Sequence, residues 1–157
     1  MANDIGLTLE KPIQELISLF DKKLNELGQS SLLDNNSFEI DKDLQFNHYL
    51  RFSYTKRQPS EIDLSFEVSN SGVIFHIDNT SEVPEWSYQA ILNDPESFQE
   101  TIENIFTCYV MVERKGRRTT VCLFNKEGNQ KMVFAYFYGI GLSFLAKSER
   151  KLYKPIF

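Results

Sequence analysis

The middle of this sequence lacks positive charge: residues 58–112 contain no lysine or arginine, although the chain has 17 of them. Cysteine and histidine are scarce, with two of each and no C-x-x-C pair, which argues against a zinc ribbon or a thioredoxin-type redox site. No apolar run approaches the ~20 residues of a membrane-spanning helix. The first residues lack a basic stretch followed by an apolar one, so we expect no signal peptide and a cytoplasmic protein.

Large apolar side chains are plentiful, with 13 Phe, 7 Tyr and 1 Trp among 157 residues. A chain of this length buries roughly 68–70% of its unfolded surface, so it needs no disulfide or metal to fold. We therefore expect one domain, residues 1–157, with Cys108 and Cys122 as reduced, buried thiols. The alternative is a disulfide: if Arg114, Lys115 and Gly116 form a three-residue hairpin loop, Cys108 lies directly opposite Cys122.

The hydrophobic period changes along the chain. Residues 11–27 carry apolar side chains every three or four positions, which predicts an amphipathic helix, with Pro12 in its first turn and Gly28 after its end. Residues 38–78 alternate with period 2, which predicts an antiparallel meander. Asp94 and Pro95 begin a second helix near 95–107. Further strands are predicted at 108–112, 119–125 and 131–138, while 79–93 and 142–157 have no clear period.

These elements predict the α+β class, with a mainly antiparallel sheet of about five to six strands and helices packed on one face. In the strand at 131–138, Phe134 and Tyr136 share one face, and Val133 and Phe137 share the other. Either the strand is central and covered on both sides, or one of its faces is exposed and available to a partner.

Charge divides the sequence into three parts. Residues 1–57 have a net charge of −2, residues 58–112 contain ten acids and no cation, and residues 113–157 have a net charge of +7. Like charges that lie close together repel, so a surface that keeps them is suited to attracting a cationic partner. Two simpler interpretations stay open: the basic third pairs with the acidic middle inside the fold, or the acids serve solubility alone.

No catalytic motif is convincing. The sequence has no P-loop, dinucleotide fingerprint, zincin or nucleophile-elbow pattern. Ser148 and Lys151 match S-x-x-K, but in a charged segment without the other motifs of that chemistry. His48 and His76 are expected to be structural, although His76 and Asp78 lie two residues apart and are a candidate acid–base or metal pair. We therefore expect no enzyme, no cofactor and no metal.

The acidic middle favours a non-enzymatic protein-binding inhibitor, such as an immunity protein that neutralises a basic toxin or nuclease, or an inhibitor of a nucleic-acid-handling effector. The expected partner is thus a basic protein. The residues expected to contact it are Asp63, Glu67, Asp78, Glu82, Glu85 and Trp86. Trp86 is equally suited to packing into the hydrophobic core instead of contacting a partner.

Three alternatives remain. A small acidic secretion chaperone, as a homodimer, has a similar size and charge, and an enzyme of unrecognised type ranks below it. The cations around Gly116 suggest an anion contact. The acidic isoelectric point, about 5.1, argues against direct nucleic-acid binding. The simpler interpretation is a charged hairpin tip that blocks edge-to-edge association.

Overall fold

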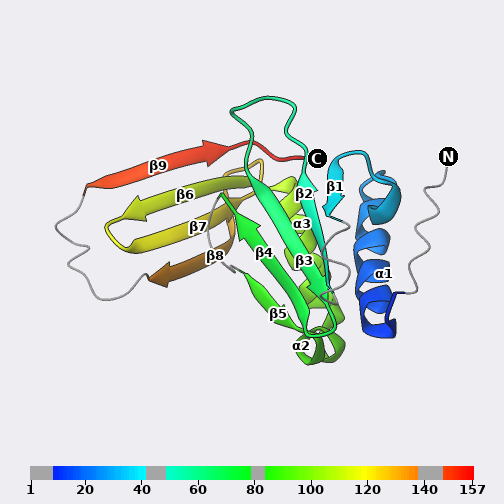
Figure 1. Cartoon of the computed structure of the whole chain (residues 1–157). Helices are drawn as coiled ribbons and strands as arrows, with labels where there is room; N and C mark the ends of the chain where they lie inside the picture. Colours follow the sequence, from blue (N-terminus) through cyan, green and yellow to red (C-terminus); the bar gives the residue numbers. More distant parts are fainter. Residues whose placement is uncertain (1–8, 42–48, 79–83, 138–146) are drawn as a thin grey trace.

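The computed structural model describes residues 9–41, 49–78, 84–137 and 147–157 (Figure 1). Helix α1, Lys11–Glu26, confirms the first predicted helix and buries the stripe Ile13, Leu16, Ile17, Phe20 and Leu24. Gly28 follows it at φ +72°, a left-handed conformation that ends helices readily because glycine has no Cβ.

The period-2 segment forms four strands of a five-stranded antiparallel sheet, here sheet A, whose strands follow the order of the chain. Its strands are β1 Phe38–Asp41, β2 Tyr49–Tyr54, β3 Leu64–Ser69, β4 Gly72–Ile77 and β5 Glu85–Ser87. Along β2 and β3 every second side chain is buried. The ring of Phe20 on α1 stacks on Phe66 of β3 at 4.7 Å between centroids, so this buried face lies against the helix.

Two further helices complete this part of the molecule. They are α2 Tyr88–Asn93 and α3 Pro95–Thr107, and a short 3-10 turn, η1 Leu32–Asp34, follows α1. The side chain of Asp94 accepts a hydrogen bond from the Ser97 amide at the start of α3, as its position before Pro95 predicts. Phe98 and Phe106 of α3 contact Phe20, so α3, α1 and sheet A share one aromatic core.

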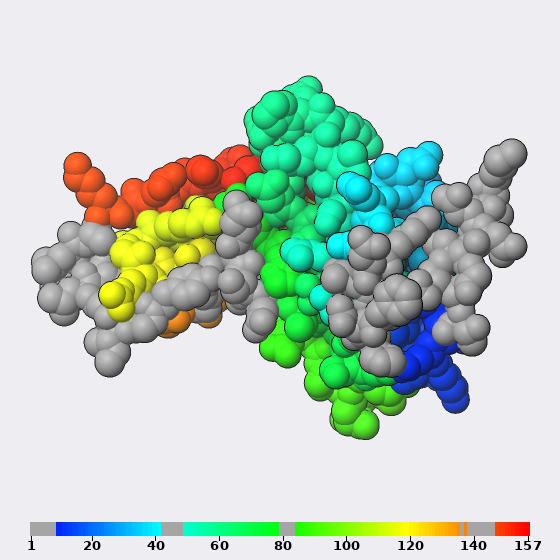
Figure 2. Space-filling view, in the orientation of Figure 1, coloured from blue at the N-terminus to red at the C-terminus, as the bar shows by residue number. Residues whose placement is uncertain are grey.

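A second antiparallel sheet, here sheet B, has the order β8-β7-β6-β9. Its strands are β6 Tyr109–Lys115, β7 Arg118–Phe124, β8 Gln130–Phe137 and β9 Ser148–Tyr153. Val110, Val112, Val121 and Leu123 bury its inner face in the same hydrophobic cluster as sheet A. In Figures 1 and 2, β6, β7 and β9 (yellow and red) lie at one end of the molecule and α1 (blue) at the other.

The α+β single domain is confirmed, but its strands differ from the prediction of one sheet of about five to six strands. The described residues form two sheets, of five and four strands. The segments without a clear hydrophobic period contain β5, α2 and β9. Elements β5 and α2 are short, and β9 is mostly exposed, so burial imposes little apolar pattern on their sequences.

The register expected around the β6–β7 turn is wrong. Lys115 pairs with Arg118, so the loop has two residues rather than three, and Met111 rather than Cys108 lies opposite Cys122. Both cysteines are free thiols. Ser148 and Lys151 lie on the extended strand β9, which does not place them one helical turn apart as S-x-x-K chemistry requires.

Candidate functional site

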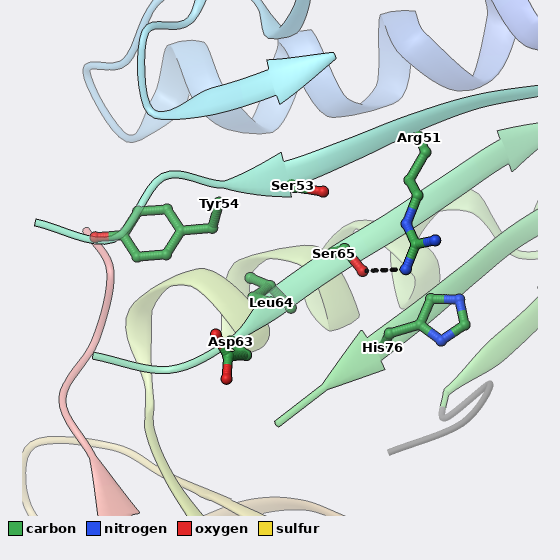
Figure 3. Close-up of a pocket in the computed structure, with 7 residues that line it drawn as sticks. All are labelled: Arg51, Ser53, Tyr54, Asp63, Leu64, Ser65 and His76. Carbon is green, nitrogen blue, oxygen red and sulfur yellow. Dashed lines mark hydrogen bonds between the residues drawn. The ribbon is translucent and has the colours of Figure 1, made fainter. Parts of the chain in front are cut away.

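The polar face of sheet A carries an open hollow of about 380 Å³ (Figure 3). Its position follows from strand alternation: Ser53, Ser65 and His76 are aligned across β2, β3 and β4, while the residues between them point into the core. The lining residues are Arg51, Ser53, Tyr54, Asp63, Leu64, Ser65 and His76.

This hollow contains serines, a histidine and a carboxylate, which are the residue types of a nucleophilic site. The Arg51 guanidinium donates to Ser65 Oγ at 3.3 Å, as the dashed line in Figure 3 marks. His76 Nε2 instead lies 3.6 Å from Glu67 Oε1, which Arg51 Nη1 also approaches at 3.9 Å. Accepting a hydrogen bond from the guanidinium does not turn the Ser65 hydroxyl into a nucleophile, because activation needs a base that accepts the hydroxyl proton. The geometry is that of an ion-paired sheet face.

The cysteines offer no activated thiol either. Burial raises the pKa of Cys108, and burial likewise raises that of Cys122. A raised pKa lowers the fraction of reactive thiolate at neutral pH. Within the described part of the chain, no group of three or more His, Cys, Asp or Glu is placed to hold a metal ion. No described helix is long and apolar enough to cross a membrane.

Asp78 lies inside the molecule, where it joins the two sheets. It is 4% exposed, and it follows β4 at φ +50°, which aspartate tolerates better than most residues. Arg114 of β6 donates to its Oδ2 at 3.1 Å and to its carbonyl at 2.5 Å, and the Tyr153 hydroxyl donates to its Oδ1 at 2.7 Å. These partners from β6 and β9 hold the end of β4 against sheet B.

Cations from the first third of the chain neutralise several acids of the middle third. Lys56 pairs with Asp63 at 2.8 Å, and Arg51 approaches Glu67. Lys23 pairs with Glu103 at 3.0 Å, and its pKa is raised because its hydrogen bonds to Glu103 and Glu26 outweigh the lowering by burial. Among the described residues, one ion pair joins the acidic middle to the basic last third, Arg114 with Asp78. Within the described part of the chain, the two oppositely charged thirds thus share one direct ion pair, although Glu100 and Glu103 line a hollow together with Lys126 and Lys131.

Five acids of the middle third make no ion pair with any described residue. Glu61 and Asp94 instead accept hydrogen bonds from backbone amides, which leaves Glu85, Glu96 and Glu100. All three are exposed. They lie on β5 and α3, which are connected through α2. The ring of Trp86, next to Glu85, packs edge-on against the ring of Phe98 on α3, with 5.7 Å between the ring centres. We name Glu85, Glu96, Glu100 and the half-exposed Leu92 of α2 the acidic end.

The six residues predicted to contact a partner are therefore dispersed. Asp63 and Glu67 lie on the polar face of sheet A, Asp78 is buried, and Glu82 lies outside the described residues. Glu85 is exposed, and Trp86 is partly buried against the core. The four-residue spacing of Glu96 and Glu100 indicates that they share one face of α3. The sequence gives little indication of Leu92, which is only an apolar residue just before the Asp94 cap.

Comparison with known proteins adds nothing to this geometry: no protein-family model, no curated protein and no solved structure matches this chain.

Proposed function

We propose that the chain is a non-enzymatic protein-binding domain that inhibits a basic partner protein through its acidic end. The observation that carries the proposal is that some acids of the middle third form ion pairs with described residues and others do not. Asp63 and Glu67 are paired with Lys56 and Arg51, whereas Glu85, Glu96 and Glu100 face solvent without an ion pair among the described residues. Unpaired like charges on one end of a fold give a field that attracts a cationic surface.

The proposed mechanism is occlusion. The three carboxylates take the places that phosphates of a nucleic acid occupy on a basic partner, and long-range attraction speeds the encounter. Leu92, with half of its surface exposed, supplies an apolar contact among the charges. Interfaces obtain most of their affinity from a few such buried contacts, while charges at the rim set the association rate and its salt dependence.

The experiment is capture from a lysate of the producing cells, with elution by salt and identification of bound proteins by mass spectrometry. One variant combines Glu85→Lys, Glu96→Lys and Glu100→Lys. The control combines Asp34→Lys, Glu39→Lys and Glu149→Lys, which changes the net charge equally at exposed acids elsewhere.

The proposal expects one basic protein at near-stoichiometric yield, retained by the control and weakened at least about tenfold by the acidic-end variant. A set of unrelated unfolded proteins would instead support a chaperone. Equal retention of one partner by both variants would exclude the acidic end as the binding surface.

A further inference from the structure

A second hollow, here the α3 hollow, lies between helix α3 and the hairpin of β7 and β8. The helix presents Glu100 and Glu103 to it, and the hairpin presents Lys126 and Lys131. Its volume is about 330 Å³, at the small end of the range of about 300–1,000 Å³ that ligand sites span. A hollow of this size suits a small molecule.

The buried wall of the α3 hollow contains a hydrogen-bond donor without an acceptor. Asn104 lines the hollow and is 7% exposed. The thiol of Cys108 donates to its Oδ1 at 3.6 Å, whereas its Nδ2 has no hydrogen-bond partner within the described part of the chain. Buried donors in native proteins nearly always have an acceptor. The terminal torsion of asparagine is soft, so a small rotation turns Nδ2 toward an acceptor placed in the hollow.

The charges that line the α3 hollow are of both signs. Glu103 is already paired, with Lys23 at 3.0 Å. Four further charged lining residues form no ion pair with any described residue: Glu100, Glu127, Lys126 and Lys131. Two are acids and two are cations. A ligand of one sign therefore meets repulsion as well as attraction, whereas a ligand with both charges is able to place each beside its opposite.

We propose that the α3 hollow binds a small zwitterion of the α-amino acid class. The carboxylate of the ligand accepts a hydrogen bond from Asn104 Nδ2 and lies toward Lys126 and Lys131. Its ammonium group lies toward Glu100 and Glu127. The proposal does not rest on the proposed inhibition, although Glu100 also belongs to the acidic end.

The unpartnered donor selects this occupant over others. A lysine or arginine side chain of a basic partner carries only donors, so it cannot accept from Asn104 Nδ2. A carboxylic acid without an amino group would leave Glu100 and Glu127 without a cation. A metal ion is not favoured, because no group of three or more His, Cys, Asp or Glu among the described residues is placed to hold one.

The probe is L-alanine, titrated into the isotope-labelled full chain. Two-dimensional proton–nitrogen NMR observes the side-chain NH₂ of Asn104 directly. Propionate and ethylamine are the matched control ligands, because propionate lacks the ammonium group of L-alanine and ethylamine lacks its carboxylate.

Two variants test the lining residues. One combines Lys126→Gln and Lys131→Gln. The other, Asn104→Asp, replaces the donor with an acceptor of the same shape. The matched control combines Lys147→Gln and Lys151→Gln, which removes the same charge at exposed lysines outside the hollow. Circular dichroism verifies that the variants keep the wild-type fold, and both lysine variants change exposed side chains only.

The proposal expects a saturable shift of the Asn104 NH₂ signals with L-alanine. Affinity should fall at least about tenfold in the Lys126 and Lys131 variant and in Asn104→Asp, but less than about threefold in the control. Propionate and ethylamine should each bind at least about tenfold more weakly than L-alanine.

The proposal is overturned by absence of a saturable shift, by equal binding of propionate or ethylamine, or by equal effects of the two lysine variants. Shifts confined to residues outside the α3 hollow would also overturn it. Because the titration contains no partner protein, its failure would leave the proposed inhibition standing, and loss of the captured partner would not affect this result.

Discussion

At the scale of single residues, Asp78 decides how the two sheets meet. Its carboxylate accepts hydrogen bonds from Arg114 of β6 and Tyr153 of β9, and it is buried. The spacing of His76 and Asp78 suggested an acid–base or metal pair, but the fold uses Asp78 as a structural acceptor. Sequence spacing did not reveal this role because both hydrogen-bonding partners are more than thirty residues away in the chain.

Replacing this carboxylate should weaken the fold. Asp78→Ala removes the carboxylate that accepts from Tyr153 and from Arg114 Nη1, and leaves Arg114 only the backbone carbonyl of residue 78. We expect a loss of about 2–4 kcal/mol in the free energy of unfolding. Asp63→Ala removes only an exposed pair with Lys56 and should cost less than about 1 kcal/mol. Urea unfolding of both variants measures the difference, and equal losses would contradict the structural role of Asp78.

The Tyr153 hydroxyl predicts a dependence of stability on alkaline pH. Burial and its hydrogen bond to Asp78 raise the pKa of Tyr153 above the ordinary tyrosine value. A raised folded-state pKa contributes stability that is complete below the unfolded value, about 10, and is lost as the pH rises above it.

Tyr153→Phe should therefore cost about 1 kcal/mol at neutral pH, and its deficit relative to the wild type should shrink above about pH 10. Urea unfolding at a series of pH values measures this gap. A gap that stays constant or widens at alkaline pH would show that Tyr153 does not titrate in this way.

At the scale of elements, close packing of backbone fixes the turn between β3 and β4. Gly72 has φ +141°, and a Cβ added there would lie 2.0 Å from the carbonyl oxygen of Trp86 on β5. Gly72→Ala must therefore displace β5, and we expect a loss of more than about 2 kcal/mol.

Gly128→Ala is the matched control. Gly128 has φ +83° but nothing within 4 Å of its added Cβ, so only backbone strain of about 1 kcal/mol is expected. Urea unfolding compares the two. The emission of Trp86, the single tryptophan, should change in Gly72→Ala alone. A Gly72→Ala variant as stable as Gly128→Ala would contradict the described approach of β5.

The elements that were predicted correctly from the sequence are those with one buried face and one exposed face. In α1 and β3, one face meets the core, so the apolar period survives in the sequence. Strand β9 meets the core mainly through Tyr153, and its charged residues face solvent, so its sequence resembles a polar tail. The acidic end was partly predictable from the spacing of Glu96 and Glu100, but only the fold shows which acids are paired by Arg51, Lys56 or Lys23.

At the scale of the whole molecule, one hydrophobic core extends through both sheets. Phe66 of sheet A and Val121 of sheet B belong to the same buried cluster. The two sheets should therefore unfold together, as small domains with a single core usually do.

This predicts that Trp86 fluorescence, which reports on sheet A, and far-ultraviolet circular dichroism have the same urea midpoint. Val121→Ala, in sheet B, should destabilise by about 2 kcal/mol and lower both midpoints equally. Two separated transitions, or a shift in circular dichroism alone, would show that the sheets unfold independently.

The net charge of −5 conceals an arrangement in which the acidic and basic thirds occupy different elements and share a single ion pair among the described residues. The two charges meet in one hollow, which Glu100 and Glu103 of α3 line together with Lys126 and Lys131 of the β7–β8 hairpin. The proposed inhibitor function depends on the acidic end alone.

The most direct measurement of that claim is the amide hydrogen-exchange footprint of the captured basic partner on the full chain. The account predicts slowed exchange in residues 85–103, which include β5, α2 and most of α3. Slowed exchange confined to the hollow around Arg51 and His76, or to β8, would contradict the assignment of inhibition to the acidic end.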